Sequence, residues 1–236
     1  SKLYIMKIVI LCGGLGTRLS EETKTIPKPM VKIGSKPIIE HLMLIYMKNG
    51  FNDFILAAGY KYKIIQRYFK NHKIFKNVKV INTGNKSLTG LRLFKLKKYL
   101  SKEKNFMLTY GDGLTNQNIK KLLKYHLKHN RVATVTAVRP PVRFGEIYIK
   151  KSFIKKFSEK PQARKGWING GFFIFKGKIF NYLDKSNVML ETKPIEKLVK
   201  NSQLKAFKHL GFWQCMDTLR EKKYLNQLYK SKKNIW

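Results

Sequence analysis

The first 138 residues alternate short apolar runs with amphipathic stretches, and this pattern constrains the fold more than any other feature of the chain. The apolar runs have the length and β-branched content of strands, whereas the stretches between them have helical periodicity. Such alternation predicts an α/β fold with a mostly parallel sheet and helices on both of its faces. Strands are expected at residues 7–11, 54–57, 78–81, 106–109 and 133–138, and helices at 37–48, 62–71, 91–100 and 118–128.

The pattern changes after Pro140-Pro141. Short strands are expected at residues 147–149, 153–157 and 171–175, followed by helices at 193–200 and 219–229. Neither an internal repeat nor a low-complexity linker separates the two halves, so we interpret residues 6–236 as a single domain. Residues 1–5 are expected to form a short N-terminal extension.

The chain is strongly basic, with a formal net charge of +37 over 236 residues. Only 8 of its 50 cationic residues are Arg, and the Lys residues are spread over the whole length. Ile, Asn, Phe and Tyr are abundant as well, which is typical of proteins encoded by AT-rich genomes. We therefore expect solvated basic surfaces and do not expect nucleic acid as a partner. A basic nucleic-acid-binding protein is the alternative from a different functional class, although no matching motif supports it.

The cysteine content and the hydropathy indicate the cellular setting. Cys12 and Cys215 are the only cysteines, too few for a metal cluster, and a reduced cytoplasmic setting is the simplest interpretation. No apolar run reaches the ~18 residues that span a bilayer, and no signal-peptide pattern precedes the first strand. We expect a soluble cytoplasmic protein without a membrane partner.

A glycine-rich turn follows the first expected strand. Gly13, Gly14 and Gly16 leave backbone N–H groups open to phosphate oxygens, and Arg18 and Lys28 add positive charge nearby. The spacing matches neither a Walker loop nor the G-x-G-x-x-G pattern. An ordinary turn between a strand and a helix is the alternative, but the two cations favour an anion-binding loop.

Asp is scarce, and two of the four Asp residues occupy positions that favour a function. Asp112 lies between two glycines directly after an expected strand, and Asp217 directly precedes an expected helix. Asp217 has an alternative role as the N-cap of the helix that begins at Thr218. Two carboxylates that face a polyphosphate suit Mg²⁺, which prefers oxygen ligands and bridges phosphates.

Two later segments offer polar groups for a second ligand. Glu159-Lys160 places a hydrogen-bond acceptor beside a cation, and Asn169-Gly170 combines an amide with backbone that a ligand can approach closely. A solvated loop and a strand entry with a bulge are the respective alternatives. The five His residues show neither metal-ligand spacing nor a triad order. Positioning and charge neutralisation, rather than a protein nucleophile, are therefore expected to carry the chemistry.

Eight motifs occur in order along nearly the whole chain. They are G-G-L-G-T-R-L-S-E-E-T (13–23), P-K-P-M (27–30), S-L-T-G-L-R (87–92), T-Y-G-D-G (109–113), R-F-G (143–145), E-K-P (159–161), N-G-G-F-F (169–173) and G-F-W-Q-C-M-D-T-L-R (211–220). Each motif alone is weak, but the ordered set is specific. With these motifs the chain resembles the sugar-phosphate nucleotidyltransferase family, and within it the glucose-1-phosphate cytidylyltransferases most closely.

The resemblance implies a fold and a reaction. The fold is a Rossmann-like, mostly parallel mixed sheet flanked by helices, of the nucleotide-diphospho-sugar transferase type. The reaction joins CTP and a hexose 1-phosphate, with α-D-glucose 1-phosphate as the expected substrate, to give a CDP-sugar and pyrophosphate. The sugar phosphate attacks the α-phosphorus directly with the assistance of Mg²⁺. The resemblance also implies a homo-oligomer.

The resemblance assigns roles to residues of this sequence. Arg18, Lys28, Asp112 and Asp217 are expected to be catalytic, with Asp112 and Asp217 as ligands of Mg²⁺. Nucleotide binding is expected at Leu11, Cys12, Gly13, Gly14, Leu15, Gly16, Thr17, Arg18, Lys28, Ser87, Thr89, Gly90, Arg92 and Gly111. Binding of the sugar phosphate is expected at Gly145, Glu159, Lys160, Asn169 and Gly170.

The chain also departs from the family pattern. Ile26 stands where the family often has a Lys, Cys12 stands for a small residue, and Val142 replaces an expected glycine. The stretch from Tyr68 to Thr83 lacks an insertion of roughly twenty residues, at a place where recognition can be tuned. Transfer from UTP or dTTP, or to another sugar 1-phosphate, is therefore the alternative within the same class. A third alternative is a sugar-nucleotide sensor without catalytic activity.

Overall fold

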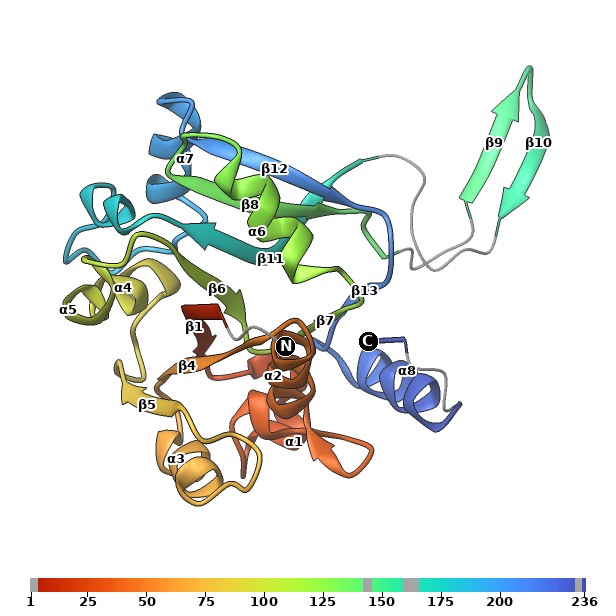
Figure 1. Ribbon diagram of the computed structural model, residues 1–236. Helices are drawn as coiled ribbons and strands as arrows, with labels where there is room; N and C mark the ends of the chain where they lie inside the picture. The colour runs from red at the N-terminus through yellow and green to blue at the C-terminus, as the bar shows by residue number, and fades with distance from the viewer. Residues whose placement is uncertain (1–3, 142–145, 159–165, 232–234) are drawn as a thin grey trace.

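The apolar runs of the sequence assemble into one seven-stranded sheet (Figure 1). The computed structural model describes residues 4–141, 146–158, 166–231 and 235–236, and within these β11 runs antiparallel to both of its neighbours in an otherwise parallel sheet. The predicted mostly parallel mixed sheet is therefore confirmed. The strand order is β12 (Leu204–His209), β8 (Ala133–Val138), β11 (Ile168–Phe175), β6 (Phe106–Tyr110), β1 (Tyr4–Cys12), β4 (Phe51–Ala58) and β5 (Val78–Asn82).

β1 lies between β4 and β6, and both of its faces are buried. Ile8 and Ile10 belong to the core on one face of the sheet, whereas Val9 and Leu11 belong to the core on the other face. Because side chains of a strand alternate between the two faces, a strand covered on both sides needs an uninterrupted apolar run. The carboxyl end of β1 is thereby held rigidly from both faces, and the glycine-rich turn starts from this fixed point.

Helices cover both faces of the sheet, as the sequence predicted. The core that contains Ile8 receives side chains from α2 (Ile38–Lys48), α3 (Tyr62–Lys70), α6 (Ile119–Leu127) and α8 (Leu219–Lys230). The core that contains Val9 receives side chains from α4 (Thr89–Phe94), α5 (Lys97–Leu100), the 3-10 helix η3 (Gly177–Asn181) and α7 (Lys193–Lys200). Within the described ranges, no helix is long and apolar enough to cross a membrane.

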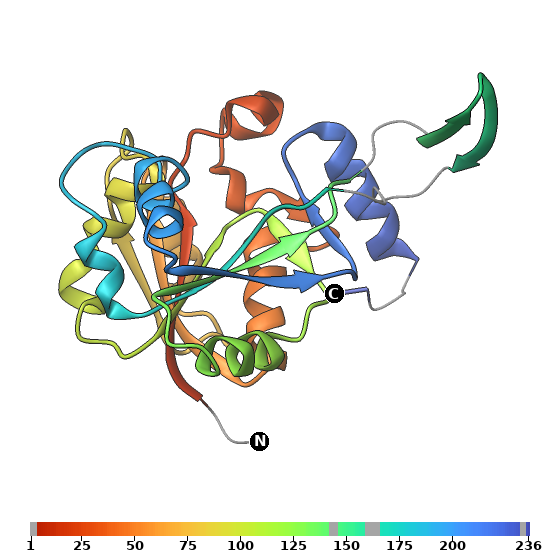
Figure 2. The same cartoon turned by 90° about the horizontal axis from the view of Figure 1, so that it is seen from above.

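Smaller elements surround the carboxyl edge of the sheet. The chain between β1 and α2 forms η1 (Thr17–Leu19), α1 (Ser20–Thr23), η2 (Lys28–Met30), β2 (Lys32–Ile33) and β3 (Lys36–Pro37). Further along the chain, β7 (Gly113–Thr115) pairs with β13 (Trp213–Cys215). A hairpin of β9 (Glu146–Lys150) and β10 (Phe153–Ser158) stands away from the sheet in both views (Figures 1 and 2).

Several expectations about secondary structure need correction. The helix expected at residues 91–100 begins earlier, at Thr89, and consists of α4 and α5, which Lys95 and Leu96 separate. The strands β2, β3, β7, β12 and β13 were not expected, and β3 includes Pro37, which was expected to begin the helix that starts at Ile38. β12 is an edge strand that pairs with β8, and its Lys205 and Lys208 break the apolar pattern of a buried strand. Charged side chains are typical of edge strands, because they oppose pairing with other chains.

A chain of buried polar groups connects α6 to β8. His126 is fully buried, and its Nε2 lies 3.0 Å from Oδ1 of Asn105 while its Nδ1 lies 2.8 Å from Oγ1 of Thr134. The amide oxygen of Asn105 can only accept, so Nε2 of His126 donates to it. When the ring is neutral, its Nδ1 accepts from the Thr134 hydroxyl, which also lies 2.8 Å from Nε2 of His129. Burial, together with the positive charge of the neighbouring His129 and Lys176, lowers the pKa of His126 to about 4.

We predict that His126 makes the protein less stable in mild acid. Its pKa in the folded chain lies below the value of about 6.5 of an unfolded His, so the unfolded state takes up a proton first as the pH falls. The stabilising effect of neutral His126 is complete above pH ~6.5 and is lost between pH ~6.5 and 4, at about 1.4 kcal/mol per pH unit. Urea unfolding of wild type and His126→Gln at several pH values measures this. Equal pH slopes for the two proteins would contradict the prediction.

Candidate active site

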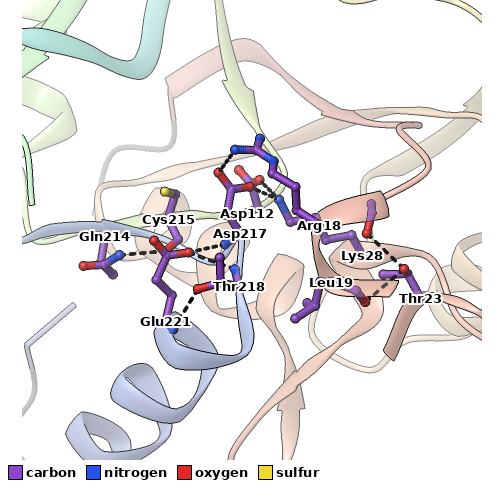
Figure 3. A network of polar contacts seen from close by, with 11 residues as sticks. Arg18, Leu19, Thr23, Lys28, Asp112, Gln214, Cys215, Asp217, Thr218 and Glu221 are labelled. Atoms are coloured by element: carbon purple, nitrogen blue, oxygen red, sulfur yellow. Dashed lines mark hydrogen bonds and ion pairs between the residues drawn. The ribbon is translucent and has the colours of Figure 1, made fainter. Parts of the chain in front are cut away.

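The glycine-rich turn leaves the carboxyl end of β1 and folds tightly around Gly16. Gly16 has a φ of 67°, and a Cβ at this position would lie 2.8 Å from Cγ2 of Thr23. The Thr23 hydroxyl donates to the carbonyl oxygens of Gly16 and Leu19, at 3.0 Å in both cases (Figure 3). A Cβ on Gly14, in contrast, would have no neighbour within 4 Å, so a ligand can approach its backbone. The turn is thus fixed on one side and open on the other.

Arg92 of α4 holds the turn from behind. Its side chain is nearly completely buried, and a Cβ on Gly13 would lie 1.9 Å from its Nη1 atom. No Asp or Glu of the described residues forms an ion pair with Arg92. Its guanidinium instead donates hydrogen bonds of 2.5 to 3.2 Å to the carbonyl oxygens of Gly13, Ala58, Gly84 and Ser87 and to the hydroxyl of Thr83.

These bonds define what Arg92 does in the fold. They join the glycine-rich turn, the end of β4 and the loop before α4 into one rigid unit. The sequence predicted Arg92 as a nucleotide-binding residue, and its side chain does line the cavity of the site. Because protein oxygens already accept from its N–H groups, the structure indicates that Arg92 shapes the loop. Direct contact with the nucleotide stays a prediction.

Lys28 lies between the two predicted metal ligands (Figure 3). Its Nζ atom lies 2.5 Å from Oδ2 of Asp112 and also pairs with Oδ1 of Asp217. Arg18 reaches the other oxygen of Asp217 at 2.9 Å, and most of its side chain is exposed. Burial alone would lower the pKa of Lys28, but the two carboxylates outweigh burial and raise it. Lys28 is therefore a cation, and two positive groups balance two carboxylates at the site.

A short ladder brings the two carboxylates together, although they lie far apart in the sequence. Asp112 directly precedes β7, and Asp217 follows closely after β13. In the ladder Gly113 pairs with Cys215, and the backbone N–H of Met216 donates to the carbonyl oxygen of Asp112 at 2.9 Å. The distance between the carboxylates is thus set by backbone pairing and not by loops.

Thr218, and not Asp217, is the N-cap of α8. The Thr218 hydroxyl accepts from the backbone N–H of Glu221 at 3.3 Å, and the Glu221 carboxylate accepts from the backbone N–H of Thr218 at 2.9 Å. This capping box satisfies the start of the helix without the side chain of Asp217. The structural alternative considered for Asp217 is therefore wrong, and its carboxylate is free to face Lys28 and Arg18.

A bulge in β11 shapes the opposite wall of the site. The pairing of β11 with β8 shifts register between Asn169 and Phe173. The bulged strand entry that the sequence analysis considered for this segment is therefore present. Gly171 has a φ of 77°, and a Cβ there would lie 2.4 Å from the ring of Tyr110. The bulge therefore makes room for Tyr110. The indole N–H of Trp213 donates to the carbonyl oxygen of Gly170 at 2.8 Å, which joins the bulge to β13.

These elements enclose a cavity of about 470 Å³ at the carboxyl edge of the sheet. Leu15, Gly90 and Asn169 do not line this cavity, and Gly90 packs instead against the backbone of Val188. The predicted residues that line it are Leu11, Cys12, Gly13, Gly14, Gly16, Thr17, Arg18, Lys28, Ser87, Thr89, Arg92, Gly111, Asp112, Gly170 and Asp217. Gly145, Glu159 and Lys160 lie outside the described residues.

Sequence reasoning missed several residues of the wall. Tyr110 and Trp213 stand inside recognised motifs, so their neighbours in the sequence could have indicated them. Met189 also lines the cavity, but no motif surrounds it. It reaches the site because the segment before α7 packs on the start of α4, where the N–H of Gly90 donates to the carbonyl oxygen of Val188 at 3.0 Å.

Neither cysteine of the site is prepared to act as a nucleophile. Burial raises the pKa of the Cys12 thiol to about 12. Burial, with the negative charges of Asp112 and Asp217, raises the pKa of the Cys215 thiol to about 12 as well. Both thiols stay protonated at neutral pH and are poor nucleophiles. The arrangement instead suits chemistry on a bound anion, because backbone N–H groups, cations and carboxylates face one cavity.

Comparison with known proteins agrees with this geometry. A family model described as nucleotidyl transferase matches residues 7–221. The chain is 42% identical over 253 aligned positions to the glucose-1-phosphate cytidylyltransferase of Salmonella typhimurium, with 98% of both chains covered. It is 32% identical to the mannose-1-phosphate guanyltransferase of Aspergillus oryzae, in an alignment that covers 94% of this chain and 63% of that protein. The 253 positions exceed the 236 residues of this chain, so the Salmonella protein has residues without a counterpart here.

Two solved structures share the architecture. HddC from Yersinia pseudotuberculosis, complexed with GMP-PN, matches with a TM-score of 0.74 and 27% identity, covering 95% of this chain and 100% of that chain. A UDP-glucose pyrophosphorylase complexed with UDP-glucose matches with a TM-score of 0.75, covering 98% of this chain and 100% of that chain. At 20% identity the second match supports the fold alone.

We predict that Arg92→Lys destabilises the fold although it keeps the charge. An ammonium donates at most three hydrogen bonds, so at least two of the five hydrogen bonds from Arg92 are lost, at a cost of about 1–3 kcal/mol each. Urea unfolding measures the loss. Arg220→Lys on the exposed face of α8 is the matched control and should change stability by less than about 0.5 kcal/mol. Equal stabilities of the two variants would contradict the prediction.

Proposed function

The chain belongs to the nucleotidyl transferase family, and from this premise we propose that it transfers a cytidylyl group from CTP to α-D-glucose 1-phosphate. The products are CDP-glucose and pyrophosphate. One observation carries the proposal. The 42% identity to a glucose-1-phosphate cytidylyltransferase extends over 98% of both chains, and so includes every part of the described cavity.

The arrangement of the loop supports binding of the nucleotide at the glycine-rich turn. The open backbone at Gly14 and the exposed guanidinium of Arg18 offer hydrogen-bond donors and charge to a triphosphate. Ser87, Thr89 and Arg92 lie on the same cavity and come from the rigid unit that includes the turn. We assign these residues to the nucleotide.

The reaction needs no protein base. An oxygen of the sugar phosphate carries negative charge at neutral pH, because the second pKa of a phosphate monoester is ~6. This oxygen forms a bond to the α-phosphorus of CTP while the bond to the bridging oxygen breaks, and pyrophosphate leaves. Lys28 is held as a cation at the centre of the site and neutralises the charge that develops in the transition state.

The second substrate is assigned to the wall opposite the turn. Gly170 lines the cavity beside Asp112, and Asn169 lies next to it on the bulge of β11. We keep Gly145, Glu159 and Lys160, which lie outside the described residues, as proposed ligands of the sugar phosphate. The homo-oligomer expected from the resemblance also stays a prediction.

The residues of the site fit a divalent metal ion. Among the described residues no group of three or more His, Cys, Asp or Glu gathers to hold a metal. Mg²⁺ needs fewer protein ligands than that, because it keeps waters and binds substrate phosphates. Asp112 and Asp217 share a cation already, which marks the space between them as suited to positive charge. We propose that these two carboxylates hold Mg²⁺, which when bound would neutralise the phosphate oxygens.

We predict that the protein releases pyrophosphate from CTP and glucose 1-phosphate far faster than from ATP, GTP, UTP or dTTP. A coupled pyrophosphate assay with each nucleotide, and with several hexose 1-phosphates, measures this. A preference for UTP or dTTP would agree with the nucleotidyl transferase family but would contradict CTP as the substrate. Absence of release with every pair would contradict the proposed activity.

We predict that Asp112→Asn and Lys28→Ala each lower kcat/KM by at least about a hundredfold, because both side chains act on charge at the reacting phosphate. Asp184→Asn is the control, since Asp184 is exposed and lies outside the cavity. Circular dichroism checks that the variants fold. Activity within tenfold of wild type in either site variant would contradict the mechanism.

A further inference from the structure

Glu191 is placed beside the site by a segment that sequence motifs did not indicate. The chain before α7 packs on the start of α4, where the N–H of Gly90 donates to the carbonyl oxygen of Val188 at 3.0 Å. One residue before Glu191, the N–H of Leu190 donates to Oγ1 of Thr89 at 2.8 Å. Two hydrogen bonds donated by backbone N–H groups therefore fix the position of Glu191 at the edge of the cavity.

The carboxylate of Glu191 accepts a hydrogen bond at each oxygen. The Thr89 hydroxyl donates to Oε2 at 2.7 Å, and the Tyr110 hydroxyl donates to Oε1. In the described part of the chain no cation pairs with Glu191. An ionised carboxylate only accepts hydrogen bonds, so both hydroxyl protons must point towards it. Thr89 lies on the proposed nucleotide side of the cavity, and Tyr110 lies towards the bulge of β11.

The direction of the Tyr110 hydroxyl leaves its oxygen free to accept a hydrogen bond from Asn169. Because the Tyr110 hydroxyl points its proton towards Glu191, its oxygen can accept a hydrogen bond from Nδ2 of Asn169 at 3.3 Å. Oδ1 of Asn169 accepts from the backbone N–H of Gly171 at 2.8 Å. Among the described residues, Asn169 is thus held at both ends of its amide, and its second side-chain N–H has no partner.

We propose that Glu191 is a positioning residue that acts through Tyr110 to aim an N–H of Asn169 at the sugar 1-phosphate. The inference rests on the proposed function, because Asn169 is assigned there to the second substrate. Without an acceptor-only group at position 191, the Tyr110 hydroxyl can turn its proton towards Nδ2 of Asn169, and the hydrogen bond between them is lost. Oδ1 of Asn169 stays held by the backbone N–H of Gly171, so the amide keeps its polarity but loses the second contact that aims its other N–H. Glu191 therefore helps to position a donor for an acceptor-bearing ligand without touching that ligand.

Glu191→Gln tests this role, because it changes the direction of the hydrogen bond with Tyr110 while the shape of the side chain stays nearly the same. A Gln can still accept from Thr89 through its carbonyl oxygen, but its amide then donates towards Tyr110. We expect the KM for glucose 1-phosphate to rise about tenfold, equivalent to one lost hydrogen bond, while the KM for CTP changes less than about twofold. Glu196→Gln on the exposed face of α7 is the matched control and should leave both KM values unchanged.

Tyr110→Phe provides a second, independent variant. It removes the hydroxyl that connects Glu191 to Asn169, so its KM for glucose 1-phosphate should rise by a similar factor. The double variant should be no worse than either single variant, because the two residues act through one chain. Effects that multiply in the double variant, or an unchanged KM in Glu191→Gln, would overturn the proposal.

A measurement without turnover separates this proposal from the proposed function. The NMR signals of the Asn169 side-chain amide should shift in Glu191→Gln and Tyr110→Phe and stay in place in Glu196→Gln. Unshifted Asn169 signals in Glu191→Gln would overturn the role of Glu191, whatever the substrate. A wild-type protein that releases no pyrophosphate, with shifted Asn169 signals in the variant, would contradict only the proposed function.

Discussion

The ion pairs of Lys28 with Asp112 and Asp217 are the interaction on which the organisation of the site depends. Two carboxylates close together and partly buried repel each other unless a cation lies between them. Here the backbone ladder of β7 and β13 holds the two acids at a fixed separation, and η2, between β1 and α2, brings Lys28 to them. A site built in this way can accept a metal ion and a polyphosphate with little rearrangement of its backbone.

Rigidity on the other side of the site comes from a different source. Arg92 is a buried cation that pairs with backbone carbonyls of three segments, and it thereby converts loops into a fixed wall. Glu191 has a similar role on the side of the cavity formed by Thr89 and Tyr110. Its carboxylate accepts hydrogen bonds from these two hydroxyl groups and so fixes the direction of their protons. Both residues fix the positions of other groups of the site. The specificity of such a cavity depends on which hydrogen-bonding groups remain free after the protein has satisfied its own.

The sequence predicted much of this structure for physical reasons that can be stated. A short, β-branched, wholly apolar run such as residues 8–11 is typical of a strand buried on both faces, and Gly16 stands in a turn where φ is positive. β12 was missed because Lys205 and Lys208 belong to an edge strand, whose pattern is not apolar. Glu191 was missed because its position depends on the packing of two distant segments, which leaves no local pattern.

A crystal structure of the protein with CTP and Mg²⁺ would show whether the nucleotide and the metal ion bind where we propose. We expect the triphosphate against the backbone of residues 13–18, the metal ion held by Asp112 and Asp217, and Lys28 in contact with a phosphate oxygen. The base should lie beside the start of α4. A nucleotide bound elsewhere, or a metal ion that contacts neither Asp112 nor Asp217, would contradict this proposal.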